Sequence, residues 1–157
     1  MKLYLKQRIF SWFDSYHIYD KNNKIVFEVK GEFALGHFVK IYDKSGIEVG
    51  AISQKMLTWF PKFILTDGEA NEIGMICRNF SWFKPKYTLT CNDWVIEGDI
   101  WAWNYKVVDS QNKVIFTASK KFNITDQYEI DIKDDKNVLL ALMIVLAIDL
   151  DKCDPNN

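Results

Sequence analysis

The chain has 157 residues, enough for one domain with a sizeable core, and 48% hydrophobic, 15% aromatic and 26% charged residues, a globular composition rather than a disordered one. Its 20 basic and 21 acidic residues leave a net charge of −1. This balance lacks the basic excess of a nucleic-acid-binding protein, so no nucleic-acid partner is expected.

The first residues and the cysteines indicate a cytoplasmic protein. The segment Met1–Arg8 is charged throughout and lacks the apolar centre of a signal peptide. Cys77, Cys91 and Cys153 are widely spaced and form no Cys-x-x-Cys pair. We therefore expect free thiols in a reducing compartment, which makes the cytoplasm the default location, with peripheral attachment to a membrane left open.

Alternating apolar and polar residues recur between clusters rich in Asp, Asn and Gly. These residues suit tight turns because they tolerate a left-handed backbone and bond to it locally. Period-two alternation between turn signals predicts β-strands. The turn clusters are Asp20–Asn23, Asp43–Gly46, Asp67–Asn71, Asn92–Asp93 and Asp109–Asn112. The predicted strands, about twelve, lie near residues 3–9, 16–20, 24–30, 37–43, 48–55, 62–67, 72–78, 86–91, 94–99, 103–109, 113–120 and 127–132.

A second pattern occurs three times, as an apolar residue, a hydroxyl residue, Trp and Phe. The copies are Phe10–Phe13, Leu57–Phe60 and Phe80–Phe83. Pro61 and Pro85 stand in two of these segments, where ladder hydrogen bonding is expected to break. We interpret the three segments as corners between strands, and their repetition favours a sheet that closes on itself.

An unbroken apolar run, Val138–Ile148, predicts a buried helix over about 137–150. Asp134, Asp135 and Asn137 are suited to cap its start. The run has no polar stripe, which is typical of a helix surrounded on all sides. Its length as a helix would be about 16 Å, roughly half the hydrocarbon thickness of a bilayer, so no transmembrane span is predicted.

The predicted fold is mainly β with one buried C-terminal helix, in a single domain over residues 1–157. Twelve strands form a barrel too wide for side chains alone to fill, and a helix about 10–12 Å across has a suitable size for the space. We therefore predict a closed, roughly 12-stranded antiparallel β-barrel around a central hydrophobic helix. Asp149 and Asp151 lie at the negative end of that helix, an unfavourable place for acids. Either a partner such as a barrel lysine or a backbone amide satisfies them, or they meet solvent.

Several stretches are similar to segments of a known family. They are Met1–Phe10, Tyr19–Asp20 with Ile25–Gly31, Ile96–Asp99, and Asp126–Asp131 followed by the apolar run into Asp149. With the predicted architecture, they resemble the tubby-like barrels of the LURP-one-related family, and more distantly the phospholipid scramblases. The resemblance covers essentially the whole chain and implies a tubby-like fold but little chemistry. Its relatives include phosphoinositide-binding domains and membrane-associated scramblases, but no basic residue here matches such a site.

No motif indicates catalysis, a cofactor or a metal. His17 and His37 fall in or beside predicted strands, with no Ser-His-Asp or Cys-His arrangement. The segment Asp149–Asp154 lacks the central Gly and the closing Glu of a calcium loop. The glycines have neither the spacing nor the following helix of a phosphate-binding loop. We predict no cofactor, no metal and no enzymatic activity.

The corner segments supply the candidate interaction site. Tryptophans with nearby lysines suit a membrane interface or an anionic ligand. The alternative is that these aromatic side chains turn inward and fill the barrel around the helix. The candidate interaction rim comprises Trp12, Trp59, Lys62, Trp82, Lys84 and Lys86.

The predicted function is that of a non-enzymatic binding or scaffold domain. Because its own helix occupies the interior, the barrel exterior is expected to contact anionic lipid headgroups or a protein partner. One alternative is a small-ligand or nucleotide binder at the barrel mouth near Asp149 and Asp151. Another is an enzyme with no recognisable motif.

Overall fold

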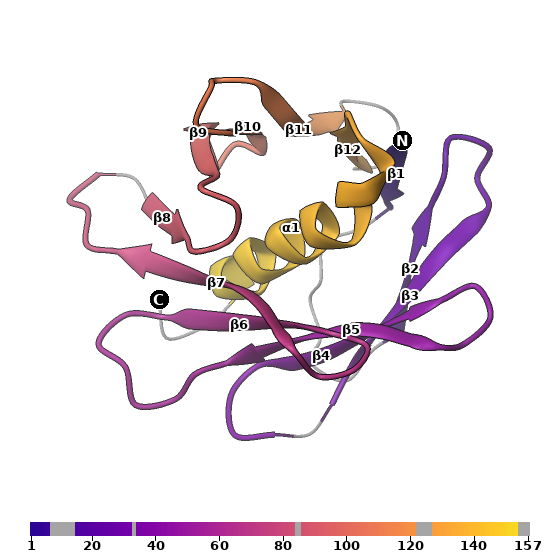
Figure 1. Cartoon of the computed structure of the whole chain (residues 1–157), viewed down its shortest axis with the longest axis horizontal. Helices are drawn as coiled ribbons and strands as arrows, with labels where there is room; N and C mark the ends of the chain where they lie inside the picture. The colour runs from indigo at the N-terminus through magenta and orange to yellow at the C-terminus, as the bar shows by residue number, and fades with distance from the viewer. Residues whose placement is uncertain (7–14, 33, 84–85, 122–126, 154–157) are drawn as a thin grey trace.

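The computed structural model describes residues 1–6, 15–32, 34–83, 86–121 and 127–153, and within them one sheet of twelve strands and one α-helix (Figure 1). The strands are β1 (Lys2–Leu5), β2 (Ser15–Tyr19), β3 (Ile25–Gly31), β4 (Phe38–Asp43), β5 (Glu48–Gln54), β6 (Lys62–Asp67), β7 (Glu72–Asn79), β8 (Lys86–Leu89), β9 (Val95–Asp99), β10 (Asn104–Val108), β11 (Val114–Lys121) and β12 (Gln127–Ile132). A 3₁₀ turn, η1 (Asp135–Asn137), leads into helix α1 (Val138–Cys153).

Four aspartates build the turns that the sequence predicts. Asp20, Asp43, Asp67 and Asp109 each accept hydrogen bonds at 2.8 to 3.0 Å from the backbone N–H groups two and four residues further on. One carboxylate thereby satisfies two backbone donors that the hairpin turn leaves without a ladder partner. These turns begin and end the strands within a residue or two of the predicted positions.

The sheet is antiparallel and wraps around into a nearly closed barrel. Its strand order is β8-β7-β6-β5-β4-β3-β2-β1-β12-β11-β10-β9, so the first strand pairs with the last, with Leu3 opposite Ile130. Strands β8 and β9 stand at the two ends of this order, and no ladder joins them in the described residues. We call this place the seam. The predicted barrel is confirmed, with closure that stops short of a complete hydrogen-bonded ring.

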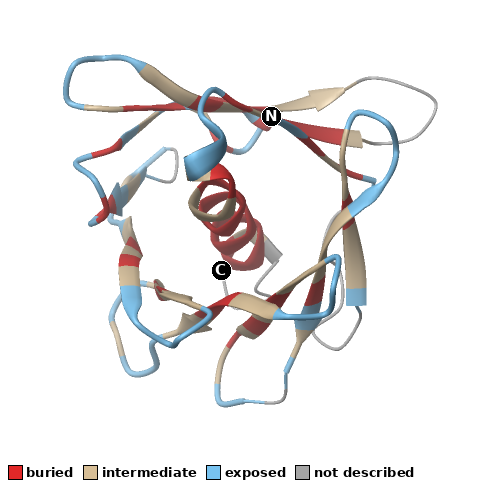
Figure 2. Cartoon of the chain, turned by 45° about the vertical axis from the view of Figure 1, so that its right-hand side comes forward, coloured by how far each residue is buried: buried red, intermediate tan, exposed pale blue. Residues whose placement is uncertain are grey.

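Helix α1 lies inside the barrel, as predicted (Figures 1 and 2). Every residue from 141 to 151 is buried, and Leu142 and Val145 are completely inaccessible. Gly50 on β5 leaves room for the helix, because a Cβ there would lie 3.0 Å from Cε of Met143 and 2.8 Å from the carbonyl oxygen of Thr66. Each fully buried aliphatic side chain stabilises the fold by about 1.5–3 kcal/mol. The helix is therefore the core around which the strands pack.

Antiparallel connectivity divides the connections into two groups, one at each end of the barrel. Connections that follow even-numbered strands contain the aspartate turns and the entry to α1, and we call this the polar end. Connections that follow odd-numbered strands lie at the opposite end, which we call the aromatic end. In Figure 1 the β5–β6 and β7–β8 loops of the aromatic end project to the left, near the C-terminal end of α1.

Candidate functional site

Two neighbouring loops of the aromatic end form a single cluster of rings. The β5–β6 loop and the β7–β8 loop are held together by strand pairing between β6 and β7 and by a 2.9 Å bond from the backbone N–H of Arg78 to the carbonyl of Pro61. The ring centroids of Phe60 and Phe80 lie 6.3 Å apart, and Phe80 meets Trp82 edge to face at 5.0 Å. Rings from both loops therefore share one surface.

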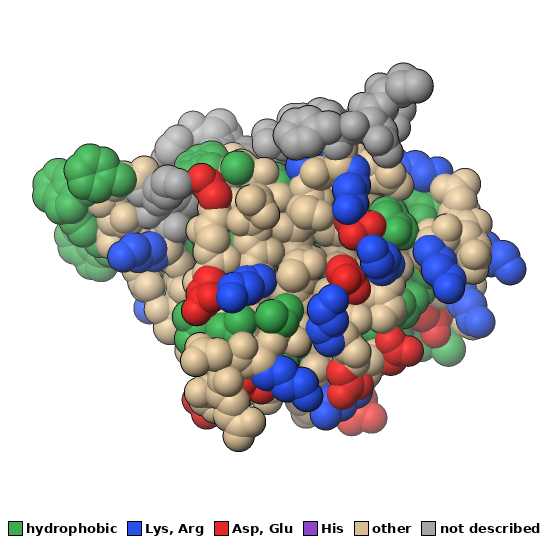
Figure 3. All heavy atoms as spheres, turned by 90° about the horizontal axis from the view of Figure 1, so that it is seen from above, with side chains coloured by type: hydrophobic (Ala, Val, Ile, Leu, Met, Phe, Trp, Pro, Cys, Tyr) green, Lys and Arg blue, Asp and Glu red, His purple; other side chains and the backbone are tan. Residues whose placement is uncertain are grey.

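This surface exposes large apolar side chains almost completely. Relative exposure is 102% for Leu57, 100% for Trp59, 83% for Trp82 and 96% for Phe83. Figure 3 shows hydrophobic side chains protruding at the left edge of the molecule, the side to which the two loops extend in Figure 1. Scattered exposed apolar residues are ordinary, whereas large contiguous apolar patches are typical of interaction surfaces. We call the set Met56, Leu57, Trp59, Phe60, Phe80, Trp82 and Phe83 the aromatic patch.

The backbone of the β5–β6 loop holds Leu57 outward in an unfavourable conformation. Its φ is 59°, in the left-handed region, which costs a residue with a Cβ roughly 1–2 kcal/mol. The next side chain stabilises the loop, because the Thr58 hydroxyl donates to the carbonyl of Phe60 at 2.7 Å. A leucine that is both strained and fully exposed contributes nothing evident to the fold, which points to a role outside it.

Three lysines border the aromatic patch without forming an ion pair to any other described residue: Lys55, Lys62 and Lys86. Lys55 and Lys62 face each other across the base of the β5–β6 loop, where the N–H of Lys55 donates to the carbonyl of Lys62 at 2.8 Å. Lys86 opens β8, opposite Asn79. The patch therefore combines apolar side chains with cations whose charge is not neutralised by nearby described carboxylates.

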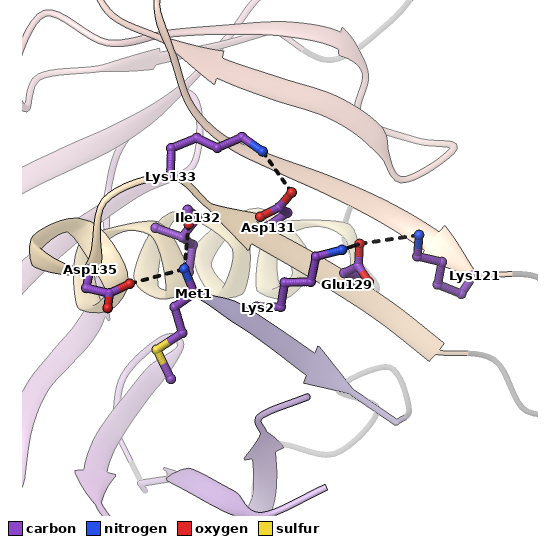
Figure 4. A network of polar contacts seen from close by, with 8 residues as sticks. All are labelled: Met1, Lys2, Lys121, Glu129, Asp131, Ile132, Lys133 and Asp135. Atoms are coloured by element: carbon purple, nitrogen blue, oxygen red, sulfur yellow. Dashed lines mark hydrogen bonds and ion pairs between the residues drawn. The ribbon is translucent and has the colours of Figure 1, made fainter. Parts of the chain in front are cut away.

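The wall formed by β1, β11 and β12 is different, since its lysines are paired (Figure 4). Glu129 contacts Lys2 at 3.1 Å and Lys121 at 3.3 Å, and Lys133 binds Asp131 at 2.8 Å. Burial raises the pKa of Glu129, but hydrogen bonds led by that from Lys2 outweigh it and hold this pKa below its usual value. The cations of this wall are engaged within the chain.

Asp149 and Asp151 do not open to solvent, since their exposures are 1% and 2%. Asp151 accepts a hydrogen bond from the hydroxyl of Tyr87 and lies 3.5 Å from a guanidinium nitrogen of Arg78. Burial and the charge of Asp151 raise the pKa of Tyr87, and burial and the charge of Asp149 raise that of Tyr105. Of the two alternatives for these aspartates, the structure shows a partner within the chain for Asp151, in the phenol of Tyr87 and the guanidinium of Arg78.

The structure brings together four of the six residues proposed from sequence as an interaction rim, Trp59, Lys62, Trp82 and Lys86. The other two, Trp12 and Lys84, lie outside the described residues. The alternative that the tryptophans turn inward is wrong for Trp59 and Trp82, because loop backbone carries both away from the barrel. Sequence reasoning missed six contributors, although four of them are members of the repeated corner pattern: Lys55, Met56, Leu57, Phe60, Phe80 and Phe83.

A cleft with a volume of about 1030 Å³ lies at the polar end. Three lysines and three aspartates line it, and contacts within the chain engage several of them, such as Lys136 with Asp134 at 3.2 Å and Lys133 with Asp131 at 2.8 Å. In the described part of the chain, no three His, Cys, Asp or Glu side chains group as metal ligands. Of the described helices, none is long and apolar enough to cross a membrane.

Comparison with known proteins gives consistent matches over almost the whole chain. A family model described as LURP-one-related matches residues 1–151. The uncharacterized protein YxjI of Bacillus subtilis (strain 168) is 28% identical over 151 residues, which cover 96% of this chain and 93% of YxjI. An X-ray structure of an Arabidopsis thaliana protein aligns with a TM-score of 0.62 at 15% identity, over 92% of this chain and 88% of that one. At this identity the structural match shows a shared fold.

Proposed function

The chain belongs to the LURP-one-related family, and on this premise we propose that it is a non-enzymatic binding domain that attaches peripherally to an anionic membrane surface through its aromatic end. The observation that supports the proposal most strongly is the aromatic patch with its three lysines, which form no ion pair with the described residues. The helix fills the barrel, which leaves the exterior as the place where such a domain meets its partner.

A membrane interface matches both components of this surface. Trp and Phe side chains favour the boundary between headgroups and acyl chains, where an apolar body is buried. Each lysine near an anionic bilayer adds about 1 kcal/mol of attraction. Lys55 and Lys62 stand at the base of the loop that holds Leu57 and Trp59, and Lys86 stands at the base of the loop that holds Trp82 and Phe83. A domain that inserts the tips would place the ammonium groups at the level of the headgroups.

The small-ligand alternative at the barrel mouth has less support. It places a ligand beside Asp149 and Asp151, and both carboxylates are buried. Asp151 already accepts from Tyr87 and lies against Arg78. A ligand at this position would have to displace contacts within the chain.

The test is sedimentation with vesicles of phosphatidylcholine, with and without phosphatidylserine, at low salt. We expect the protein to sediment with the anionic vesicles and to dissociate as salt rises. Replacing Leu57 and Trp59 together by Ser should weaken binding at least tenfold, because each loses about 1.5–3 kcal/mol of apolar burial. Lys62→Glu should weaken it mainly at low salt.

Matched controls lie at the polar end. Ile47→Ser removes an apolar side chain that is 62% exposed in the β4–β5 turn, and Lys44→Glu changes the net charge as Lys62→Glu does. Both control variants should bind like the wild type. No sedimentation with anionic vesicles at low salt would overturn the membrane proposal. Equal loss in the controls would overturn its placement at the aromatic end. Patch-dependent self-association without lipid binding, seen by analytical ultracentrifugation, would replace the membrane with a second copy of the chain.

A further inference from the structure

The seam between β8 and β9 is the one interruption of the barrel wall in the described residues, and it lies beside the aromatic patch. Strand β8 has four residues and pairs on one side only, with β7, while β9 has five and pairs only with β10. Edge strands this short have few ladder bonds to hold them. Other contacts must therefore keep β8 and β9 against the helix.

Those contacts come from two consecutive residues in the last turn of α1. Asp151 accepts from the Tyr87 hydroxyl on β8 and faces Arg78 on β7, so it holds one side of the seam. Lys152 donates to the carbonyl of Ile100, just after β9, and therefore holds the other side. The two interactions reach the two sides of the seam from neighbouring positions on one helix.

Ring contacts extend the second half of this arrangement. The ammonium of Lys152 lies 5.1 Å from the ring centroid of Trp103 and 5.9 Å from that of Trp101. A cation over an aromatic face is attracted by the negative charge of the ring face, and the attraction is stronger where water is excluded. Trp103 is 2% exposed, so the contact lies largely within the protein. The β9–β10 loop is thereby tied to the helix end.

We infer that the Asp151–Lys152 pair is a clasp that closes the barrel at its seam, with Asp151 positioning β8 and the β7–β8 loop, and Lys152 positioning the β9–β10 loop. Hydrogen-bonded ladders join the strands elsewhere in the sheet. Here the helix end replaces the ladder. The segment freed by opening the clasp would carry Phe80, Trp82 and Phe83, three of the seven residues of the aromatic patch.

The polar character of the helix end is explained in the same way. Buried acidic residues at a helix C-terminus oppose the dipole and lose hydration, and such a group is retained only when partners compensate it. Tyr87 and Arg78 supply that compensation for Asp151. Removing one partner from such a pair leaves a buried charge without compensation. The resulting local destabilisation should therefore be larger than that caused by removing an ordinary surface hydrogen bond.

The experiment is hydrogen–deuterium exchange with mass spectrometry on the full chain without lipid, so its outcome does not depend on membrane attachment. Tyr87→Phe keeps the ring and removes the donor, and should speed exchange in residues 86–89 about tenfold or more. Lys152→Met keeps most of the stem and should speed exchange in residues 95–103. In both variants, exchange in residues 48–54, in β5, which is three strands away from β8 in the sheet, should stay at the wild-type rate.

Tyr4→Phe is the matched control, because Tyr4 also bonds to a carboxylate, Glu129, but in the wall where ladders join β2, β1 and β12. It should leave exchange in residues 2–5 and 127–132 unchanged. The clasp would be refuted if Tyr87→Phe left residues 86–89 at the wild-type rate, or if it raised exchange equally in every strand. Asp151→Asn is a second variant with the expected pattern of Tyr87→Phe, and if it fails to fold, Tyr87→Phe alone decides.

Discussion

Both ends of the barrel are built from short connections between antiparallel strands. The connections at one end are rich in polar residues, whereas those at the other end expose aromatic and aliphatic side chains. At the polar end, left-handed backbone positions are taken mostly by asparagine and aspartate, at Asn23, Asn92, Asp93 and Asn112, which adopt this conformation readily, with Ala70 as an exception. At the aromatic end, the corresponding position of the β5–β6 loop is taken by Leu57. The polar end is built for its own stability, whereas the aromatic end accepts strain and exposure.

The difference lies in where the side chains of each end find partners. At the polar end the four turn aspartates bond to the backbone of their own turns, and the cleft-lining Lys136 pairs with Asp134. At the aromatic end the tips of Leu57 and Trp59 contact water, and the flanking Lys62 has no described anion. A surface whose groups are already satisfied has little to offer a partner. This difference is the reason for which we propose the aromatic end, rather than the polar end, as the interaction surface.

Helix α1 forms the core between the two ends. Disrupting this helix should therefore unfold both ends and have the largest effect on stability. Leu142 is completely buried in the middle of the helix. Leu142→Asp would place an unpaired carboxylate there, at a cost of several kcal/mol against a total stability of about 5–15 kcal/mol. We expect no cooperative unfolding transition by circular dichroism in urea.

Leu142→Met is the control for this substitution, because it keeps volume and apolarity and should lower the free energy of unfolding by less than about 1.5 kcal/mol. A soluble Leu142→Asp protein that unfolds cooperatively would show that the helix is not the shared core of the two ends. The two ends would then not depend on a single shared core.

The fold follows from the sequence because its signals are local. An aspartate turn such as Asp67–Asn71 is a property of a few consecutive residues, and the apolar run from Val138 to Ile148 has no polar face at any helical phase. Predicted and observed strands therefore agree closely. The seam was not predictable, because period-two alternation marks β8 and β9 as strands but does not say which neighbours they bond to.

The candidate site was harder to predict because it depends on loop geometry and distant contacts. Alternation reports which face of a strand is buried, but Trp59 and Trp82 lie in loops without a period, so inward and outward orientations stayed open. The partner of Asp151 is Tyr87, 64 residues earlier in the chain, and no local pattern links them. The repeat that contains Leu57 and Phe83 was visible, but their exposure required the three-dimensional arrangement.

An intermediate effect is expected at the polar end, where acid should weaken the turns. Hydrogen bonds from the side chain and backbone of Asn71 hold the pKa of Asp67 below its usual value. A carboxyl whose pKa is lower in the folded state contributes stability that is complete above its unfolded pKa of about 3.9 and is lost as pH falls through the folded pKa. Asp67→Ala should therefore lower the melting temperature at pH 7.

The pH dependence separates this explanation from a general loss of packing. The difference in melting temperature between wild type and Asp67→Ala should shrink as pH is lowered from about 5 to 2, because the wild-type carboxyl becomes protonated. Scanning calorimetry across this range measures it. A difference in melting temperature that stays constant with pH would mean that the Asp67 charge does not stabilise the polar end. Charged turn residues would then not explain why the polar end differs from the aromatic end.

The smallest expected effect lies at the aromatic end and has an unusual direction. Leu57→Gly relieves a left-handed conformation that costs leucine roughly 1–2 kcal/mol, while glycine adds about 0.5–1 kcal/mol of backbone entropy to the unfolded chain. The leucine side chain is fully exposed and loses no packing on removal. The free energy of unfolding should therefore stay constant or rise by up to about 1 kcal/mol, measured by urea denaturation.

Asn23→Gly is the corresponding change at the polar end, where asparagine already tolerates φ of 61°. Little strain is relieved there, so this variant should be neutral or slightly less stable than the wild type. Compared with Asn23→Gly, the Leu57→Gly variant should have the larger free energy of unfolding. It should also bind anionic vesicles less tightly. A Leu57→Gly protein that is clearly less stable than wild type would mean that the leucine serves the fold after all, and a stabilised variant with unchanged vesicle binding would separate the strain from the proposed function.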